Sequence, residues 1–520
     1  LDVYIFSLKY WIQTIPGLKQ FSVLQGVIAV VLFIFYLATI WYFAHPVYTL
    51  AFQAKLKRRS FIVSNFKLNL PILFPWLLLS LVYDLISLSP WAGPESFLGR
   101  PEGQMIFFAL FLCALMVFMP QLIRYWWGCV PFDPSDRIDE VKRFLDDMRF
   151  RYRGLLKWPI FEGRIMTAGI MGIIPRYRYI LVTDSLVEIL STPELKAVMA
   201  HEVGHAKYRH LLFYVFFFLG YMVLSFGLFD IIEKLLILHP YLFKLSNSGE
   251  AGNKNLYYIF LAIPILLTMV VYFRFLLGFF MRHFERQADL YSSVVMGSPM
   301  PAISALEKIA LLSGKSRDLP NWHHFSIKER VDCLWRILKE PGLVRRHNRF
   351  VAISFFTYLI CIICLGGLLN FGPLKRDIDY RLVSNIIEQQ LNKDPDNILM
   401  LQNLAILYHK MDRYGEAINT YESLLLVERR RVVLNNLAWL LVTAPDESLR
   451  APQRALALAK EAVSMERAPI YLDTLAEAYY VNGSIDKAVE TSKEAISLEP
   501  EDRTYFKKQL KRFMTSAEGG

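Results

Sequence analysis

The stretch His201-Glu202-Val203-Gly204-His205 decides both the fold and the chemistry of this 520-residue chain. Two histidines four positions apart project from one face of a helix, about one turn from each other. Both imidazoles can therefore reach one metal ion, and zinc is the usual ion for this pattern. Glu202 points toward the same place, where it is suited to accept a proton from a water molecule rather than to bind the metal.

The residues around this motif favour a metal site over an accidental match. Thr192 followed by Pro193 predicts a helix start with the threonine as N-cap, and residues 195–200 contain no helix breaker before the motif. Glu285 and Asp289 stand four apart on a second predicted helix. Glu285 can complete the metal shell, and Asp289 can accept the free N–H of a ligand histidine. The alternative is that the histidines are ordinary helix residues and the two carboxylates a solvated face.

The composition indicates a membrane protein. Hydrophobic residues make up 54% of the chain and aromatic residues 14%, which is more than ordinary soluble proteins contain. The net charge is +11, but many basic residues flank apolar segments, as in membrane proteins, so we expect no nucleic-acid partner. The five scattered cysteines predict no disulfide framework.

Six apolar segments are long enough to cross a bilayer of roughly 30 Å. They are residues 21–44, 68–88, 104–123, 211–229, 256–280 and 350–369. Residues 1–20 predict an interfacial helix. Basic residues after the first span, and a cluster at Arg345, Arg346 and Arg349 before the last, place these ends in the cytoplasm. The histidine motif and Glu285 then share the cytoplasmic side, and the segment after residue 370 lies outside. A miscounted span would move that segment to the cytoplasm.

The soluble stretch before the histidine motif combines a helix with strands. An amphipathic helix is expected over residues 138–153, and strands over residues 165–172 and 179–183. An extended substrate would pair through its backbone with an edge strand near residues 165–172. That mode of binding predicts weak side-chain specificity.

The C-terminal third predicts an array of helical hairpins. Leu404, Ala405, Tyr408, Ala417 and Tyr421 have the spacing of a 34-residue helix–turn–helix unit. A second copy contains Leu475, Ala476, Tyr479, Ala488, Ala495 and Pro500, and an irregular middle copy contains Leu437, Ala438 and Ala455. This pattern resembles tetratricopeptide repeats, which stack into an α-solenoid with a concave surface. Such a surface would recruit a substrate or a protein partner. Three unrelated amphipathic hairpins are the alternative.

Residues 125–340 resemble the membrane metalloproteases of the HtpX and CAAX prenyl protease family. The resemblance rests on residues 201–210, on Glu285 with Asp289, and on residues 324–331. It implies a gluzincin-type domain with a small β-sheet and active-site helices. It also implies one zinc ion bound by His201, His205 and Glu285, with Glu202 as the general base and Asp289 as an outer-shell carboxylate.

The same resemblance makes His324 and Arg330 candidates for binding the oxyanion or the substrate. Arg330 could equally be a helix-surface charge, and His324 a packed residue. Phe325 stands where the family usually has proline, and Thr167 where asparagine is common. These departures concern the positioning of substrate and not the metal site.

The expected fold is mainly α, in four parts. Residues 1–124 form an N-terminal membrane region with three spans, residues 125–345 a zinc metallopeptidase domain that includes two spans, residues 346–370 a sixth span, and residues 378–510 the repeat domain.

The expected function is that of an integral membrane zinc metalloendopeptidase that cleaves membrane or misfolded proteins. A bacterial inner membrane suits this combination best, with the active site on the cytoplasmic side. A dedicated CAAX-type processing protease is one alternative, although that role does not need repeats. A membrane-anchored, non-enzymatic repeat scaffold is another, against which the intact histidine motif argues.

Overall fold

The computed structural model describes residues 21–518, apart from residues 52–55, 89–97, 99, 161–164, 247–250, 314–316, 320, 341 and 499–502. The interfacial helix expected over residues 1–20 lies outside the described residues. The chain forms two compact units. The first comprises Leu1–Gly227 and Ala262–Gly366, and the second comprises Leu228–Leu261 and Gly367–Gly520. All five cysteines are free thiols, as the sequence predicts.

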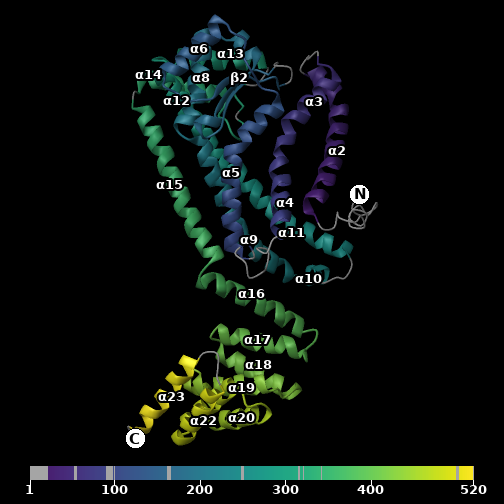
Figure 1. Ribbon diagram of the computed structural model, residues 1–520, viewed down its shortest axis with the longest axis vertical. Helices are drawn as coiled ribbons and strands as arrows, with labels where there is room; N and C mark the ends of the chain where they lie inside the picture. The colour runs from purple at the N-terminus through teal and green to yellow at the C-terminus, as the bar shows by residue number, and fades with distance from the viewer. Residues whose placement is uncertain are drawn as a thin grey trace. The chain divides into compact units, whose positions relative to one another are not determined.

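Five helical segments are long and apolar enough to cross a membrane, and they make the chain an integral membrane protein (Figure 1). They are α2 (Ser22–Ala51), α5 (Pro101–Trp127), α9 (His210–Ile237), α15 (Leu343–Asn370) and the continuous run of α11 (Ala251–Val271), the π-helical η6 (Tyr272–Leu277) and α12 (Gly278–Val295). Each is longer than the apolar segment that predicted it.

The expected second span is bent. Helices α3 (Arg58–Asn69) and α4 (Phe74–Ser87) meet at 49° across the 3-10 turn η1 (Leu70–Ile72). Pro71 and Pro75 lie at the starts of η1 and α4, where a proline lacks the N–H that a continuous helix needs. The count of six spans therefore holds only if this bent pair is one span.

A four-stranded sheet supports the histidine motif. Its order is β1-β2-β4-β3, and the strands are β1 (Val130–Pro131), β2 (Gly154–Lys157), β3 (Ala168–Met171) and β4 (Tyr179–Val182). β2 and β4 are parallel, whereas β3 pairs antiparallel with β4 and leaves its other edge unpaired within the sheet. The strands β3 and β4 are shorter than predicted, and β1 and β2 were not predicted.

The amphipathic helix before the sheet is also shorter than predicted. It is α6 (Asp136–Asp147), with Ser135 accepting a hydrogen bond from the N–H of Ile138 at its start. Arg149 has a φ of 52° just after it. This left-handed conformation ends the helix before Arg153, the predicted end. The chain then enters β2 at Gly154.

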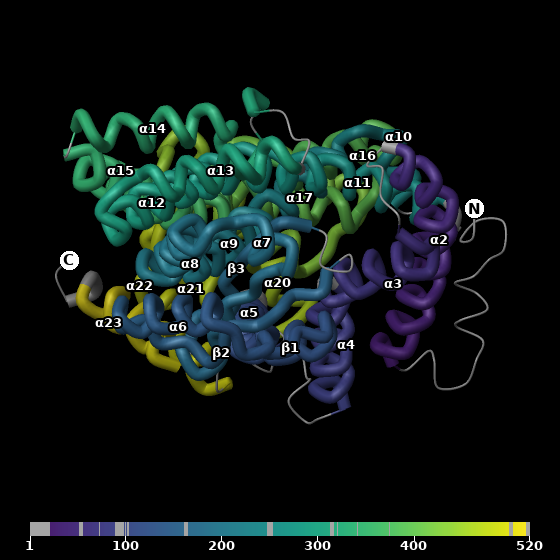
Figure 2. The backbone as a smooth tube through the Cα atoms, turned by 90° about the horizontal axis from the view of Figure 1, so that it is seen from above, coloured from purple at the N-terminus to yellow at the C-terminus, as the bar shows by residue number. Residues whose placement is uncertain are grey.

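The histidine motif lies on α8 (Thr192–Lys207). Figure 2 shows α8 between α12 and α13 (Met300–Ser313) on one side and α6 with the strands on the other. The N-cap is Ser191, not Thr192 as the sequence predicted, because Glu194 completes a capping box with Ser191. Its carboxylate accepts a hydrogen bond of 2.7 Å from the N–H of Ser191.

The second unit contains three successive pairs of helices. They are α17 (Ile398–Lys410) with α18 (Tyr414–Val427), α19 (Arg431–Thr443) with α20 (Pro452–Met465), and α21 (Pro469–Val481) with α22 (Ile485–Ser497). One apolar core runs through all three pairs. The extra residues of the middle copy form the turn η7 (Glu447–Leu449). Helices α16 (Pro373–Leu391) and α23 (Arg503–Glu518) flank the pairs. Their assignment as tetratricopeptide repeats stays a prediction.

Glu194 also joins α8 to α13. Its carboxylate accepts hydrogen bonds from Ser304 at 2.5 Å and from Lys308 at 2.8 Å. Burial raises the pKa of Glu194, but the hydrogen bonds from Lys308, Ser304 and Ser191 outweigh burial and lower it to about 2. The folded state therefore binds a proton at this site less readily than the unfolded state does.

We predict that Glu194→Gln destabilises the fold more at pH 7 than at pH 3. The stabilisation from this carboxylate is complete above its unfolded pKa of 4.5 and disappears as the pH falls toward 2. At pH 7 the substitution should lower the free energy of unfolding by about 1.5–3 kcal/mol, the range for hydrogen bonds to a charged group. Denaturant titrations in detergent at pH 7 and pH 3 measure the difference. The exposed Glu188 serves as the control position, and equal losses at both pH values would contradict the prediction.

Candidate metal centre

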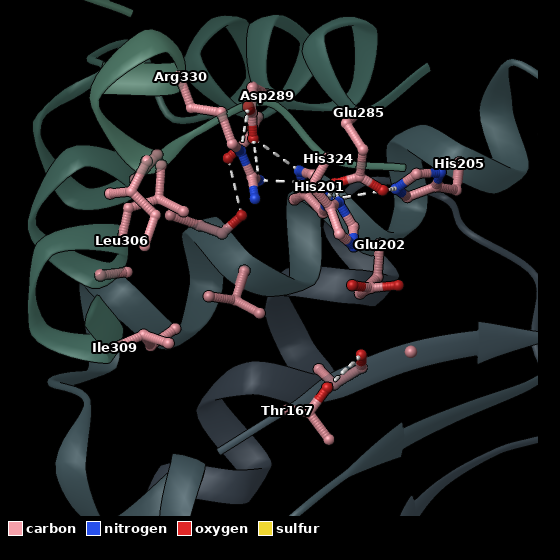
Figure 3. Close-up of a pocket in the computed structure, with 18 of the residues that line it drawn as sticks. Thr167, His201, Glu202, His205, Glu285, Asp289, Leu306, Ile309, His324 and Arg330 are labelled. Atoms are coloured by element: carbon pink, nitrogen blue, oxygen red, sulfur yellow. Dashed lines mark hydrogen bonds and ion pairs between the residues drawn. The ribbon is translucent and has the colours of Figure 1, made fainter. Parts of the chain in front are cut away.

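Three side chains from α8 and α12 present their donor atoms to one point (Figure 3). The Nε2 atoms of His201 and His205 lie 3.2 Å apart. Glu285 Oε2 lies 3.5 Å from His201 Nε2, and Glu285 Oε1 lies 3.4 Å from His205 Nε2. All three predicted ligands are thus brought together, within the described residues, into the one group able to hold a metal ion.

The spacing of these donors fits zinc. With metal–ligand bonds of about 2.0–2.1 Å in tetrahedral geometry, neighbouring donors stand about 3.3 Å apart. The observed distances of 3.2, 3.4 and 3.5 Å are close to that value. Two imidazoles and one carboxylate also leave the fourth position free, as in zinc sites that perform catalysis.

Gly204 allows the two ligand-bearing helices to approach each other. A Cβ atom at this position would lie 3.1 Å from the Cα of Ala288 on α12 and 3.2 Å from the ring of Tyr291. Nearly any side chain here would therefore push α12 away from α8. Since Glu285 stands one turn before Ala288, the glycine inside the motif helps to set the reach of the third ligand.

Asp289, the predicted partner of a ligand histidine, lies beside His201. Its Oδ1 lies 2.9 Å from Nδ1 of His201, which leaves Nε2 to face the other ligands. Arg330 on α14 (Ile327–Lys339) binds the same carboxylate through two hydrogen bonds, of 2.8 Å from Nε and 2.7 Å from Nη2. Arg330 is therefore not a free surface charge. It also lines the cavity, but part of its hydrogen-bonding capacity is used by Asp289.

His205 is oriented by a chain of side chains that the sequence analysis missed. His205 Nδ1 lies 2.9 Å from Nδ1 of His210, whose Nε2 lies 3.0 Å from Oε1 of Gln287. The Gln287 amide donates to Asn348 on α15, which donates to Tyr208. The amide oxygen of Gln287 can only accept a hydrogen bond, so the proton of the neutral His210 ring lies on Nε2. Nδ1 of His210 is then unprotonated and accepts a hydrogen bond from His205. His205 then carries its proton on Nδ1 and offers Nε2 to the metal.

The loop before α14 places His324 over the third ligand. Nδ1 of His324 lies 3.1 Å from Glu285 Oε2. Arg282 donates to the backbone oxygen of Trp322 at 2.7 Å, and the guanidinium of Arg286 lies 4.0 Å from the ring centre of Phe325. Phe325, which departs from the family pattern, therefore helps to fix the loop that positions His324.

The electrostatic surroundings of the site favour a positive charge near His201, His205 and Glu285. They also favour Glu202 as a proton acceptor. Burial lowers the pKa of His201, but hydrogen bonds to Asp289 and Glu285 outweigh burial and raise it to about 10. Burial lowers the pKa of His205 to about 4, so this ring is neutral at pH 7. Burial also raises the pKa of Glu202, which accepts a hydrogen bond from the N–H of Ile170 on β3.

A cavity of about 780 Å³ opens on the site. The edge strand β3 lines it through Ala168, Gly169 and Ile170, together with all seven residues singled out from the sequence. These are His201, Glu202, His205, Glu285, Asp289, His324 and Arg330. Their individual roles remain predictions, whereas their convergence on one cavity is a feature of the structure.

Comparison with known proteins agrees with this geometry. Residues 137–354 match the sequence profile of peptidase family M48. The family match covers the strands β2, β3 and β4, the helices α8 and α12, and α14. It overlaps the segment, residues 125–340, for which the sequence predicted a resemblance to HtpX and CAAX prenyl proteases. That resemblance is confirmed for the M48 segment. The repeat domain lies outside it.

Two curated relatives each match about a quarter of the chain. A protease HtpX homolog from Thermoplasma acidophilum is 34% identical over 140 residues, which are 27% of this chain and 39% of that protein. A second, from Aeropyrum pernix, is 30% identical over 135 residues, or 25% of this chain and 39% of that protein. The chain thus spans about two fifths of the length of each relative.

One solved structure is also similar. The crystal structure of Ste24p from S. mikatae aligns with 64% of this chain and 84% of its own, at 18% identity and a TM-score of 0.47.

We predict that Gln287→Leu weakens zinc binding about 10- to 100-fold, the range for losing a partner that orients a ligand histidine. Without the amide oxygen, His210 no longer fixes the proton of His205 on Nδ1. Competition with a zinc-chelating dye, with the protein in detergent, measures the affinity. Asn419→Leu, an amide-to-leucine change at an exposed site of α18, should leave the affinity unchanged. Equal affinity in both variants would refute this role of Gln287.

Proposed function

We propose that this chain is an integral membrane zinc metalloendopeptidase that hydrolyses peptide bonds in membrane or misfolded proteins. One observation carries the proposal: two histidines and a glutamate converge within bonding distance of a shared metal, beside the partly buried Glu202 and an unpaired strand edge. The match of residues 137–354 to peptidase family M48 supports it. A bacterial inner membrane, with this site on the cytoplasmic side, is part of the proposal.

The residues of the site divide the chemistry between them. A zinc ion held by His201, His205 and Glu285 would supply a Lewis acid that activates water and polarises the scissile carbonyl. Glu202 accepts the proton of the attacking water and returns it to the leaving amine. The raised pKa of Glu202 suits both steps, because it makes the carboxylate a stronger base. His324 and Arg330 are the proposed partners of the developing oxyanion.

The edge strand supplies the substrate-binding backbone. Thr167 turns its carbonyl toward β4, where it accepts from the N–H of Thr183 at 3.1 Å. Because directions alternate along a strand, the backbone groups of Ala168 and Ile170 face away from β4 and toward the cavity. The hydrogen bond from Ile170 N–H to Glu202 agrees with this assignment. An extended substrate can add here as a further strand.

The helix pairs of the second unit would recruit the protein to be cleaved. Leu399, Val432 and Ile470 occupy the second position of the first helix in each pair. Their side chains are 69%, 37% and 61% exposed. Exposed aliphatic residues at equivalent positions suit the capture of apolar segments, which misfolded and membrane proteins display.

The first experiment measures cleavage of a loosely folded membrane protein by the purified chain in detergent. We predict that the zinc-loaded wild type cleaves it, and that chelator or Glu202→Gln reduces the rate at least about 10³-fold through loss of the metal or of the proton acceptor. Glu202→Gln should still bind one zinc ion, because Glu202 is not a ligand. Glu188→Gln on α7 (Asp184–Ile189) is the matched control.

The outcomes separate this function from its alternatives. Cleavage confined to prenylated C-terminal peptides would favour a dedicated CAAX-type protease. A wild type that neither binds zinc nor cleaves would overturn the enzymatic function and favour a repeat scaffold.

A second experiment tests recruitment by the helix pairs. We predict that replacing Leu399, Val432 and Ile470 together by serine slows cleavage of a full-length protein substrate severalfold. Cleavage of a short peptide should not change, because the peptide reaches the metal site without recruitment. Serine replacement of Leu426, which is 90% exposed on α18, a second helix of a pair, is the control. Equal effects on the protein and the peptide would contradict recruitment.

A further inference from the structure

The edge strand β3 has one end beside the membrane spans. After β3 the chain makes the turn η5 (Pro175–Tyr177), and the ring centre of Tyr177 lies 6.4 Å from that of Phe118 on the span α5. The hydroxyl of Tyr179 donates a hydrogen bond of 2.5 Å to Gln121 on the same span. The turn therefore lies alongside α5.

Two features hold this turn in place. Gly172 has a φ of 100°, and a Cβ atom there would lie 2.3 Å from the backbone oxygen of Tyr177. The guanidinium of Arg178 donates to the backbone oxygens of Gly172 and Arg151, each at 3.2 Å, and to that of Ile173. The turn is thus held at a fixed place relative to β3.

A smaller cavity joins this end of β3 to a second span. Its volume is about 320 Å³. It is lined by Gly172 and Ile173 from the turn, and by Leu211 and Leu212, the second and third residues of the span α9. His205 lines both this cavity and the main one. The smaller cavity therefore lies between the metal centre and the first residues of α9.

The exposed side chains at this end suit the headgroup layer of a membrane. Ile174 is 40% exposed at the start of the turn. Arg176 on the turn and Arg209 just before α9 are exposed, and residues 165–183 and 203–229 contain no acidic residue. Basic residues without acidic neighbours are attracted to anionic lipid headgroups. This end of the strand therefore lies at the membrane surface.

The other end of β3 borders helices outside the spans. Ala168 packs against the apolar core that contains Leu186 of α7 and Ala305 of α13. These helices have 6 and 14 residues, too few to cross a bilayer. A chain that leaves the site past Ala168 therefore leads away from the membrane surface.

This arrangement gives a bound substrate a direction relative to the membrane. A segment that pairs antiparallel with β3 runs from the Gly172 end toward the Ala168 end, and antiparallel pairing is the more stable arrangement per residue. The residues before the scissile bond then lie at the membrane end. A substrate whose span precedes the bond can enter directly, whereas one whose span follows the bond must turn back after passing Ala168.

We propose that the site selects membrane-protein substrates by the order of their parts: it cleaves the segment that directly follows a membrane span, and not the segment that precedes one. The inference rests on the proposed function and adds a substrate class to it. The four residues of β3 pair with a similar number of substrate residues, so we expect the scissile bond about four to eight residues after the end of the span.

The test uses two model substrates, incorporated with the zinc-loaded full-length protein into liposomes that contain anionic lipid. Both carry the same span and the same cleavable segment, joined by a spacer of about 5 residues. The span comes first in one substrate and the segment comes first in the other. Rates are normalised to the fraction of each substrate whose segment lies outside the vesicle.

We expect the span-first substrate to be cleaved at least about 10-fold faster, because only this substrate can be anchored and bound at once. A flexible spacer of about 30 residues should remove most of the difference, since the chain of the segment-first substrate can then turn back. Equal cleavage of both substrates with the short spacer, together with cleavage of a soluble peptide of the same segment, would overturn the inference and leave the protease function intact.

Ile174→Glu tests the membrane end of the strand directly. It should slow cleavage of the span-first substrate severalfold, because anionic lipid repels a carboxylate at the turn. Cleavage of the soluble peptide should not change. Leu311→Glu makes the same kind of change at an 82% exposed site of α13 and is the matched control, which should affect neither substrate. Equal slowing of the span-first substrate and the peptide by Ile174→Glu would contradict a membrane role for the turn.

A cross-linking arm gives an answer even if wild type cleaves nothing. Glu202→Gln protein, with zinc added, is mixed with the span-first substrate carrying a photoreactive group in its spacer. Mass spectrometry then identifies the residues that become cross-linked. We expect cross-links to residues 172–178 or 209–212. Cross-links to α13 in their place, or none to the protein, would overturn the inference.

Discussion

The close contact between α8 and α12 is the constraint on which the site depends. Two ligands on α8 follow from helical periodicity, but the third arrives only because α12 can lie against α8 at Gly204. Both helices lead directly into or out of spans, α9 on one side and α11 on the other. The membrane region therefore does more than anchor the site. The spans also position α8, with His201 and His205, next to α12, with Glu285.

A buried group of charges is stable here because each member has a partner. Asp289 lies between His201 and Arg330, and Glu285 lies among two histidines and His324. Removing water from such groups is costly unless opposite charges and hydrogen bonds replace it. These contacts hold each imidazole with one nitrogen toward the shared point. The arrangement suits a divalent cation, because its positive charge would offset the negative charge of the Glu285 carboxylate.

The secondary structure around the site leaves one strand edge facing the cavity. The backbone groups of Ala168 and Ile170 on β3 point away from β4 and toward that cavity. The main cavity and the smaller cavity at Gly172 differ in size and lining. Because Glu194 joins α8 to α13 through hydrogen bonds from Ser304 and Lys308, the wall that α13 contributes to the main cavity is fixed relative to the histidine motif.

The sequence by itself determined the features that depend on local spacing. His201 with His205, Glu285 with Asp289, and the helical hairpins follow the period of a helix, whereas the spans follow from the length of their apolar runs. The tertiary structure alone decided Ser191 as the N-cap, the strand β2, the contacts of Gln287 with His210 and Asn348, and the pairing of Arg330 with Asp289. Each of these depends on which residues meet across elements distant in the chain, and a local period carries no information about such contacts.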